Sequence, residues 1–434
     1  MQLPIHSVGK NPKMDTHGIK ADILIPGRGD PIKNGVVIIE GKKITYAGTE
    51  KSVPDKYKSI NMAHVPVLMP GLWDCHIHYL GLGNEYSLDA AARVPLILAG
   101  ARGARDVLVT LRAGFTSVRE LAGYGIDLSK AIAEGTLVGP NIYSSNCALS
   151  QTGGHGDAHG TRLDDLINAI HCGTNFCLCD GVDECMKAVR LQLRKGASVI
   201  KVCASGGVTS ELDNPIDQQF SNSELKAMVE EANRAQRIVA AHCHGKAGIM
   251  AALNAGCHTI EHGTYLDEEA IALMKEKGAM LIATRTIVEG GMRLIGHFPP
   301  ASQAKLRVVD KIHKKAYRMA VKAGVKIALG TDLGSSIPGS ILSHGNNGQE
   351  LKFAVEAGMT PLEAIEAATA NAPSTLGPQA PLSGQLKEGY DADLIALSSN
   401  PLDNIDIFSN PDNVTHVWKG GELFKSPDLP VTLR

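Results

Sequence analysis

The stretch MPGLWDCHIH (Met69–His78) joins an apolar run to two histidines that stand two residues apart. Alternate residues of a strand point to the same face, so a strand here would present His76 and His78 together. A doubly wound nucleotide-binding sheet would instead follow its first strand with a glycine-rich turn. The histidine pair therefore favours a (β/α)8 barrel, in which polar residues at the carboxyl ends of the strands build the site.

Outward from this stretch, short apolar strands alternate with amphipathic helices, as in a (β/α)8 barrel. Two helices should begin with capping signals, SNSEL at Ser221–Leu225 and TPLEA at Thr360–Ala364. The predicted strands are Val67–Trp73, Phe115–Val118, Ile142–Ser145, Val199–Val202, Ile238–Ala241, Thr259–Glu261, Met280–Ala283 and Lys326–Leu329. The predicted helices are Leu88–Ala113, Asp183–Lys195, Ser223–Ala235, Asp267–Lys277, Ala301–Ala323 and Thr360–Asn371.

Both ends of the chain carry short strand patterns without intervening helices. ADILIP (Ala21–Pro26) lies near the N-terminus, and DADLIAL (Asp391–Leu397) lies near the C-terminus. Neither end has enough strands for a stable sheet of its own. We therefore expect one small β-sandwich, built from residues 1–66 and 376–434, beside a barrel of residues 67–375.

Composition excludes several classes of protein. The 43 basic and 45 acidic residues among 434 give a net charge of −2, so the basic field of a nucleic-acid-binding protein is missing. No apolar run approaches the ~20 residues that cross a bilayer, so we expect no membrane-spanning segment. The first residues show no apolar leader pattern, which leaves a cytoplasmic and a secreted location both open.

The number of cysteines is odd, at nine, and four of them gather in one segment. A reduced interior is expected, and one local disulfide in that segment is the alternative. The four are Cys172, Cys177, Cys179 and Cys185.

Polar residues at the predicted strand ends form a metal-binding pattern. Besides the histidine pair, Lys201 ends the fourth strand, His242 the fifth and His262 the sixth, and Asp332 follows the eighth. Imidazoles with a carboxylate suit one or two divalent ions, and zinc is the expected metal. The neighbouring Cys75 and Cys243 should point outward and pack against helices.

Lys201 stands in an apolar strand, Val199–Val202, where an unpaired ammonium group would be costly. Burial lowers the pKa of a lysine and makes its amine nucleophilic, so it can take up carbon dioxide and become a carbamate. The alternatives are an ion pair with Asp332 or Glu261, or a side chain that reaches to the barrel mouth.

Several motifs resemble the metal-dependent amidohydrolase superfamily over nearly the whole chain. They are MPGLWDCHIH, VIKVCASGG (Val199–Gly207), AAHCHGKAGI (Ala240–Ile249), TIEHGTYLDEE (Thr259–Glu269), ALGTDLG (Ala328–Gly334) and GQLKEGYDADLIAL (Gly384–Leu397). Within that superfamily, SQTGGHGD (Ser150–Asp157) and THVWKGGELFK (Thr415–Lys425) are most similar to ochratoxin amidohydrolases and the bacterial Xaa-Pro dipeptidases and carboxypeptidases near them.

The resemblance implies a binuclear site and an amide substrate. His76, His78 and Asp332 would hold the more buried metal ion, His242 and His262 would hold the more exposed one, and N6-carboxylated Lys201 would bridge them. The substrate would be a small amide or dipeptide with a free carboxylate, cut at the bond to its C-terminal amino acid, as when ochratoxin A yields ochratoxin alpha and L-phenylalanine. A homo-oligomer, an octamer in this branch, is also implied.

Four further residues are candidates at the mouth of the barrel. His155, in the GGHG loop, would help to stabilise an oxyanion or would shape the loop, while Asp332 would also act as the general base. Arg285 would clamp the substrate carboxylate, Tyr265 would donate to a substrate oxygen, and His244 would face the substrate.

Three other functions stay open at this point. Two are enzymatic: an Xaa-Pro dipeptidase, and an imidazolonepropionase-like cyclic-amide hydrolase with one metal ion and no bridging lysine. The third is a non-enzymatic binding protein that has lost its chemistry. The segments 155–179 and 333–350 border the expected mouth and depart from the pattern of the resemblance, so substrate choice is left open.

Overall fold

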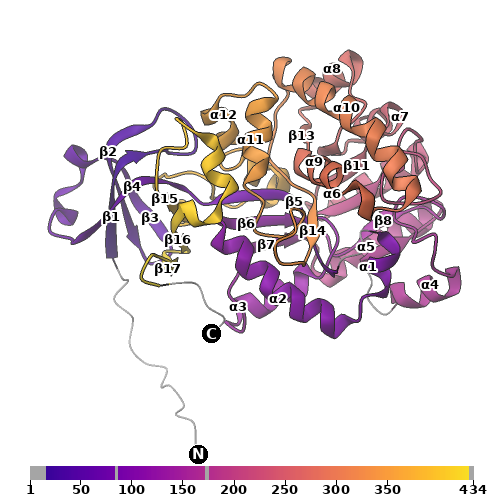
Figure 1. Ribbon diagram of the computed structural model, residues 1–434, viewed down its shortest axis with the longest axis horizontal. Coiled ribbons are helices and arrows are strands. Elements are labelled where there is room, and N and C mark those ends of the chain that lie inside the picture. The colour runs from indigo at the N-terminus through magenta and orange to yellow at the C-terminus, as the bar shows by residue number, and fades with distance from the viewer. Residues whose placement is uncertain (1–15, 84–86, 172–174, 430–434) are drawn as a thin grey trace, which may run out of the picture.

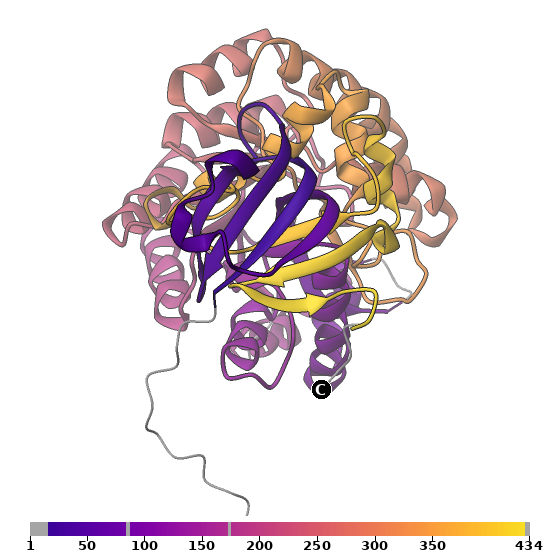
Figure 2. The same cartoon turned by 90° about the vertical axis from the view of Figure 1, so that its left-hand side faces the viewer.

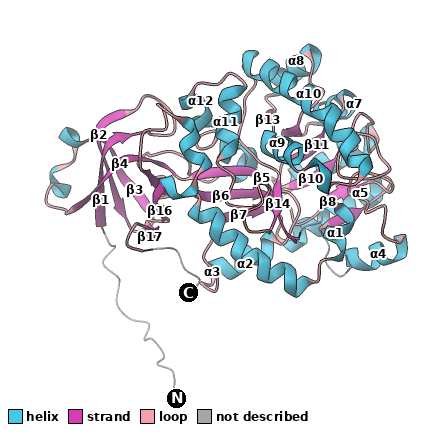
Figure 3. Cartoon of the chain, viewed as in Figure 1, coloured by secondary structure: helices cyan, strands magenta, loops and turns pink. Residues whose placement is uncertain are grey.

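The computed structural model describes residues 16–83, 87–171 and 175–429. Figure 1 shows a β-sheet at one end of the molecule and a larger body in which helices surround further strands. Figure 3 distinguishes the helices of this body from the strands that they cover. In a view turned by 90°, with this sheet facing the reader, strands from the two chain ends lie next to each other in it (Figure 2).

Seven strands form one mixed sheet, in the order β17-β16-β15-β4-β1-β2-β3. Strand β4 pairs in parallel with β1 and antiparallel with β15, so it joins the N-terminal strands to the C-terminal ones. Leu68 of β4 and Leu394 of β15 are fully buried in one apolar cluster on this sheet. The two chain ends therefore share one β module, while its residue boundaries stay a prediction.

The remaining strands form two parallel sheets, in the orders β13-β12-β11-β10-β8-β9 and β14-β5-β6-β7. The predicted α/β class with parallel strands is therefore confirmed. The strands are β1 (Thr16–Leu24), β2 (Ile32–Glu40), β3 (Lys43–Thr49), β4 (Met62–Pro70), β5 (Leu72–Leu82), β6 (Phe115–Glu120), β7 (Asn141–Ser144), β8 (Ala148–Ser150), β9 (Phe176–Leu178), β10 (Ile200–Cys203), β11 (Val239–Cys243), β12 (Thr259–His262), β13 (Met280–Ile282), β14 (Leu333–Ser335), β15 (Leu394–Leu397), β16 (Val414–Lys419) and β17 (Glu422–Lys425).

Backbone hydrogen bonds join the two parallel sheets at two separate places. Beside β7 and β10, the Ser198 amide donates to the Ser144 carbonyl over 2.8 Å. On the other side, the Ala328 amide donates to Leu281 over 3.2 Å, and the Cys75 amide donates to Leu329 over 2.8 Å. The segment around Ala328 therefore lies between β13 and β5.

That segment, Lys326–Leu329, was predicted to be a full strand, and the structure corrects this. Only one bridge, between Leu281 and Ile327, has strand geometry. The Leu329 amide donates to the Ala367 carbonyl, 3.2 Å away at the end of a helix, and so leaves the ladder. The apolar pattern of this segment does not show that the Leu329 amide will bind a helix carbonyl instead of a neighbouring strand.

The two helices for which the sequence predicts capping signals begin at those signals. Ser221 and Thr360 each accept from the backbone three residues on and complete a capping box. The predicted helix Leu88–Ala113 is two helices, because Pro95 lacks an amide hydrogen and restricts the residue before it. The helices are α1 (Leu88–Arg93), α2 (Leu96–Arg112), α3 (Gly125–Ala133), α4 (Leu163–His171), α5 (Val182–Lys195), α6 (Asn222–Arg234), α7 (Lys246–Ala255), α8 (Glu268–Lys277), α9 (Arg285–Arg293), α10 (Pro300–Lys322), α11 (Gln349–Glu356) and α12 (Pro361–Ala367), with short 3₁₀ turns between some of them.

Among the non-glycine residues with positive φ angles, His262, Thr284 and Asp332 lie at or just past strand ends that face the polar residues. Their φ angles are 68° at His262, 56° at Thr284 and 61° at Asp332. This conformation costs about 1–3 kcal/mol per residue and is found mostly where surrounding contacts enforce it. Unfavourable backbone therefore occurs at the ends of the strands that carry polar residues.

The described cysteines are free thiols, and Cys172 lies outside the described residues. Cys75 and Cys243 are fully buried in apolar clusters, as expected of packing residues. Cys179 and Cys185 are neighbours, with 3.8 Å between their sulfur atoms. Among the residues described, each helix is too short or too polar to cross a membrane.

Candidate functional site

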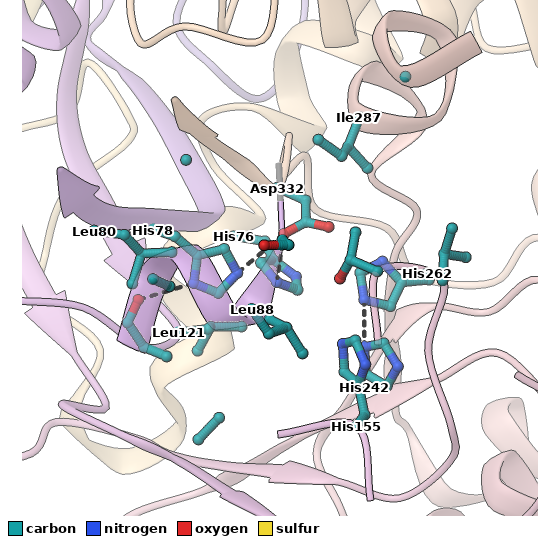
Figure 4. Close-up of a pocket in the computed structure, with 18 of the residues that line it drawn as sticks. His76, His78, Leu80, Leu88, Leu121, His155, His242, His262, Ile287 and Asp332 are labelled. Carbon is teal, nitrogen blue, oxygen red and sulfur yellow. Dashed lines mark hydrogen bonds and ion pairs between the residues drawn. The ribbon is translucent and has the colours of Figure 1, made fainter. Parts of the chain in front are cut away.

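A cavity of about 170 Å³ opens at the carboxyl ends of the parallel strands. Figure 4 shows imidazole and carboxylate groups converging in it from different strands. The charged, imidazole and thiol side chains that line it are His76, His78, His155, Lys201, Cys203, His242, His244, His262 and Asp332. All six predicted metal ligands therefore line one cavity, together with His155 and His244.

The first cluster consists of His76, His78 and Asp332. Asp332 Oδ1 lies 3.0 Å from His78 Nε2 and 3.5 Å from His76 Nε2. The other ring nitrogen of each histidine is occupied: His76 Nδ1 lies 2.8 Å from a carboxylate oxygen of Glu261, and His78 Nδ1 lies 2.8 Å from the Ala122 carbonyl.

These partners determine where the imidazole protons are. A carbonyl or an ionised carboxylate only accepts hydrogen bonds, so both Nδ1 atoms must be the donors. In the neutral rings both Nε2 atoms then carry lone pairs, and these face Asp332, which is a third acceptor. Three acceptors that converge without a hydrogen between them fit a bound cation, so this donor set passes the test for a divalent metal site.

The second cluster consists of His242, His244 and His262, all buried. His242 Nε2 donates to the Gly206 carbonyl over 3.2 Å, which leaves a lone pair on Nδ1. That nitrogen lies 2.9 Å from His262 Nε2. His262 Nδ1 and His244 Nδ1 contact the hydroxyls of Thr284 and Thr264, over 2.8 and 2.7 Å. The second cluster can therefore also offer imidazole lone pairs to a cation.

Lys201 and the His76 ring connect the two clusters. Lys201 Nζ lies 3.3 Å from His76 Nε2, and the centroids of the His76 and His262 rings are 5.1 Å apart. Burial lowers the pKa of Lys201, although Glu261 and Asp332 oppose that shift. The lysine is therefore buried at the point where the clusters meet, as its apolar strand predicted.

Four histidines of the site, His76, His242, His244 and His262, are neutral at pH 7, which is the protonation state that binds a metal ion. Burial, followed by the field of Lys201, lowers the pKa of His76 to about 4. Burial likewise lowers the pKa of His244 to about 3, and it holds the pKa values of His242 and His262 well below the usual range.

Asp332 keeps its charge in spite of burial. Desolvation raises the pKa of this carboxyl, but the neighbouring His76, His78 and Lys201 outweigh it and hold the pKa well below its usual range. The carboxylate is therefore ionised at neutral pH and able to accept a proton or a metal ion.

Sequence reasoning missed the buried ion pair between Arg119 and Glu261. Both side chains have no exposed surface, and Arg119 Nη2 lies 2.8 and 3.0 Å from the two Glu261 oxygens. Burial raises the pKa of Glu261, but Arg119 and His76 lower it to about 2. Glu261 therefore stays ionised and fixes the proton of His76 on Nδ1. The sequence did carry a sign of this ion pair, because charged residues stand inside the strands Phe115–Glu120 and Thr259–His262.

The structure does not bring Arg285 into the cavity, which corrects the expected carboxylate clamp. Its guanidinium is 4% exposed and is paired with Glu289 and Asp310. Nη1 also donates to the Asp310 carbonyl over 3.0 Å. These acceptors bind the N–H groups of the guanidinium, so no N–H group of Arg285 is left to bind a substrate in the cavity. Tyr265 does not line the cavity either; its amide donates to the His244 carbonyl over 2.9 Å.

Most of the cavity wall is apolar. Leu342 reaches it from the segment after Asp332, which sequence analysis singled out, and Phe176 reaches it from the segment 155–179. An apolar cavity of ~150 Å³ can hold a benzene molecule, so an aromatic ring fits a site of this size. The apolar lining residues are Leu80, Leu82, Leu88, Ala91, Leu121, Ala122, Ala148, Phe176, Val208, Ile287, Val288, Phe298, Leu306 and Leu342.

Residues 67–424 match the model of the amidohydrolase family. The chain belongs to the amidohydrolase family. As a member it is a hydrolase that acts on amide bonds, and metal dependence is typical of the family. The two clusters of converging acceptors suit that chemistry.

This amidohydrolase is similar to characterised relatives along nearly its whole length. It is 52% identical to ochratoxinase of Aspergillus niger over 95% of this chain and 87% of the relative. The crystal structure of A. niger ochratoxinase superposes with a TM-score of 0.90 and 51% identity, covering 95% of this chain and 96% of that one. A prolidase crystallised with N-methylphosphonate-L-proline superposes with a TM-score of 0.86 and 32% identity, covering 95% and 100%.

The Glu261→Gln variant should bind a divalent metal less tightly than the unmodified chain does. An amide in place of the carboxylate removes the charge that faces Arg119 and no longer fixes the His76 proton on Nδ1. Loss of such a supporting partner typically costs about 10–100-fold in metal affinity. Metal retained after dialysis against graded chelator measures the effect.

The matched control is Glu269→Gln on α8, because the Glu269 side chain is 67% exposed. It should retain metal as the unmodified chain does. Equal retention by Glu261→Gln would mean that Glu261 does not support the site.

Proposed function

We propose that the chain is a binuclear metal-dependent amide hydrolase that releases a C-terminal amino acid, with ochratoxin A, cut to ochratoxin alpha and L-phenylalanine, as the substrate to test first. The observation that carries the proposal is the pair of histidine-rich clusters with ligand atoms suited to metal ions, joined at His76 and Lys201 inside one largely apolar cavity. Similarity to ochratoxinase supports the substrate. Hydrolysis needs the polar clusters, and an aromatic substrate needs the apolar wall.

The proposal includes a closed (β/α)8 barrel with the site at its carboxyl-terminal mouth. Hydrogen bonds that join the two parallel sheets at two separate places support closure of the barrel. In such barrels the loops after the strands build the site and vary with substrate. The β-sandwich expected at the other end of the molecule would then be a separate module.

Two divalent ions, with zinc the expected metal, would be held by the clusters. His76, His78 and Asp332 would bind one ion, His242 and His262 would bind the other, and carboxylated Lys201 would bridge them. When bound, such ions lower the pKa of a water molecule and polarise the scissile carbonyl group.

The chain's own residues would then position the reactants and move protons. Asp332, ionised in the cavity, would accept a proton on its carboxylate and later give it to the leaving amine. His244 lines the cavity with one nitrogen on Thr264, so its other nitrogen is the better candidate for a substrate oxygen than Arg285 or Tyr265. The apolar wall would hold the aromatic part and exclude water.

An Xaa-Pro dipeptidase is the second candidate function. Its support is the similarity to the prolidase structure. The imidazolonepropionase-like alternative has less support, because it would not use Lys201, which is buried beside His76.

A homo-oligomer, an octamer by resemblance, also remains a proposal. Leu96, Ile97 and Leu98 stand together at the start of α2 and are 56%, 90% and 41% exposed. Such a run of exposed apolar side chains is typical of a surface that another chain covers.

Hydrolysis of a small panel of amides tests the function. The panel is ochratoxin A, N-acyl-phenylalanines, Xaa-Pro dipeptides and an imidazolone, each with and without a chelator. We expect mass spectrometry to detect phenylalanine release that the chelator stops and added zinc restores. Cleavage of Xaa-Pro dipeptides alone would favour the second candidate, and no cleavage by metal-loaded protein would reject both.

Asp332→Asn should lower kcat by roughly 10²–10⁴-fold, because the amide cannot take up the proton. Circular dichroism should show an unchanged fold. Asp403→Asn, at an exposed position, is the matched control and should leave kcat unchanged. Substantial turnover by Asp332→Asn would rule out its role as the base.

Carboxylation of Lys201 should add about 44 Da per chain in native mass spectrometry, and acid denaturation should remove it. Lys201→Ala should lack this increment. A native mass equal to that of the bare chain in metal-loaded protein would mean that Lys201 is not a carbamate.

A further inference from the structure

The loop between β10 and α6 carries a buried polar network that the proposed hydrolysis does not use. Asp213 lies at its centre and accepts four hydrogen bonds. The Gly207 amide donates over 2.9 Å, Gln219 Nε2 over 3.1 Å and Lys305 Nζ over 3.1 Å. The fourth donor is the Ser210 hydroxyl. Four donors to its two oxygens are the arrangement expected for an ionised carboxylate, so we treat Asp213 as ionised.

This network ends on the ring of His155. Ser210 Oγ lies 2.9 Å from His155 Nδ1, and the His155 backbone amide donates to Gln219 over 2.8 Å. Ser210 thus stands between the Asp213 carboxylate and an imidazole that lines the cavity.

Close packing holds the His155 ring in place from two directions. It stacks on His242 with 4.2 Å between ring centroids and 19° between planes. A Cβ atom at Gly207 would come within 2.0 Å of His155 Nδ1, so only glycine leaves room for the ring there. The ring therefore has little freedom to turn, and its protonation pattern determines what it offers to the cavity.

The hydrogen count along the network decides the tautomer. A hydroxyl has one hydrogen to donate, and an ionised carboxylate can only accept. Since Ser210 gives its hydrogen to Asp213, its oxygen must accept from His155 Nδ1–H. The neutral ring then has a lone pair on Nε2.

We propose that Asp213 is a positioning residue which, acting through Ser210, holds His155 as the Nδ1–H tautomer, so that Nε2 faces the substrate as a hydrogen-bond acceptor. Lys305 of α10 fixes this arrangement, because it also donates to the carbonyls of Gly207 and Ser210 over 3.1 and 2.8 Å.

The proposal rests on the proposed amide hydrolysis and changes the part that His155 plays in it. A neutral imidazole in this tautomer cannot donate to an oxyanion from Nε2, which is the role expected from the sequence. It can instead accept from an N–H or O–H group of the substrate. The N–H of a secondary amide, as in an N-acyl-phenylalanine, is such a donor, and an Xaa-Pro bond has none.

Asp213→Asn tests the proposal with almost no change of shape. The new amide can donate to Ser210 Oγ, which then donates to His155 Nδ1 and moves the ring proton to Nε2. On N-acyl-phenylalanine we expect kcat/KM to fall by about 10–100-fold, as when other groups that orient a histidine are removed. Metal content should stay unchanged.

Two comparisons separate positioning from a general structural effect. Ser210→Thr keeps the hydroxyl and should retain activity, while Ser210→Ala should lose as much as Asp213→Asn. In a His155→Gln background, Asp213→Asn should cause no further loss, and additive losses would overturn the proposal. Asp217→Asn, at an exposed position of the same loop, is the matched control and should behave as the unmodified chain.

A spectroscopic measurement tests the tautomer without any substrate. In full-length protein labelled with ¹⁵N-histidine, the His155 signals are identified by their loss in His155→Gln. We expect the pattern of an Nδ1–H ring in the unmodified chain and of an Nε2–H ring in Asp213→Asn. The same tautomer in both proteins would overturn the proposal. This result does not depend on the amide panel, so a failure of the proposed hydrolysis can be told apart from a failure of the proposed tautomer.

Discussion

The interaction on which the site depends is the buried chain from Arg119 through Glu261 to His76. Its three side chains come from β6, β12 and β5 and have at most 1% of their surface exposed. Burying charges in this way is costly unless each finds a partner, and removal of one partner leaves the other uncompensated. The three strands are therefore held at one relative position, and the same contact turns the free nitrogen of His76 towards the cavity.

Other buried acids act in the same way around the cavity. Asp74 accepts from the amides of His76 and Thr331 over 3.1 and 3.0 Å, and from Asn347 Nδ2 over 2.7 Å. Strand β5 is thereby tied to the turn before Asp332 and to the segment that follows it. Glu350 accepts from the amides that begin α9, over 2.9 and 2.7 Å. Asp74 thus satisfies backbone groups of β5 and of the turn before Asp332, and Glu350 satisfies those just past β13. The Asp332 amide, whose residue has left-handed backbone, donates to the His76 carbonyl over 2.6 Å.

The cavity has a polar side and an apolar side. The imidazoles, Lys201 and Asp332 gather where the strands end, and the loops and helices add a wall of aliphatic and phenyl groups. Among the residues that line it, Lys201 is the only lysine or arginine. A substrate carboxylate would therefore meet imidazole and backbone donors, because Arg285 is already bound to Glu289 and Asp310.

By itself, the sequence determined the alternation of strands and helices and the residues that meet at the strand ends, because periodicity and capping act over a few residues. It also predicted that Lys201 would be buried, since its neighbours in the strand are apolar. Only the tertiary structure decided which partner each charged group meets. Arg285 pairs with Asp310, Arg119 with Glu261, and Ser210 with His155. The partners in each pair are far apart in the sequence, so no local sequence pattern predicts that they meet. These contacts determine which imidazole nitrogen carries the proton and which guanidinium is unavailable, because both depend on distances between residues that are far apart in the chain.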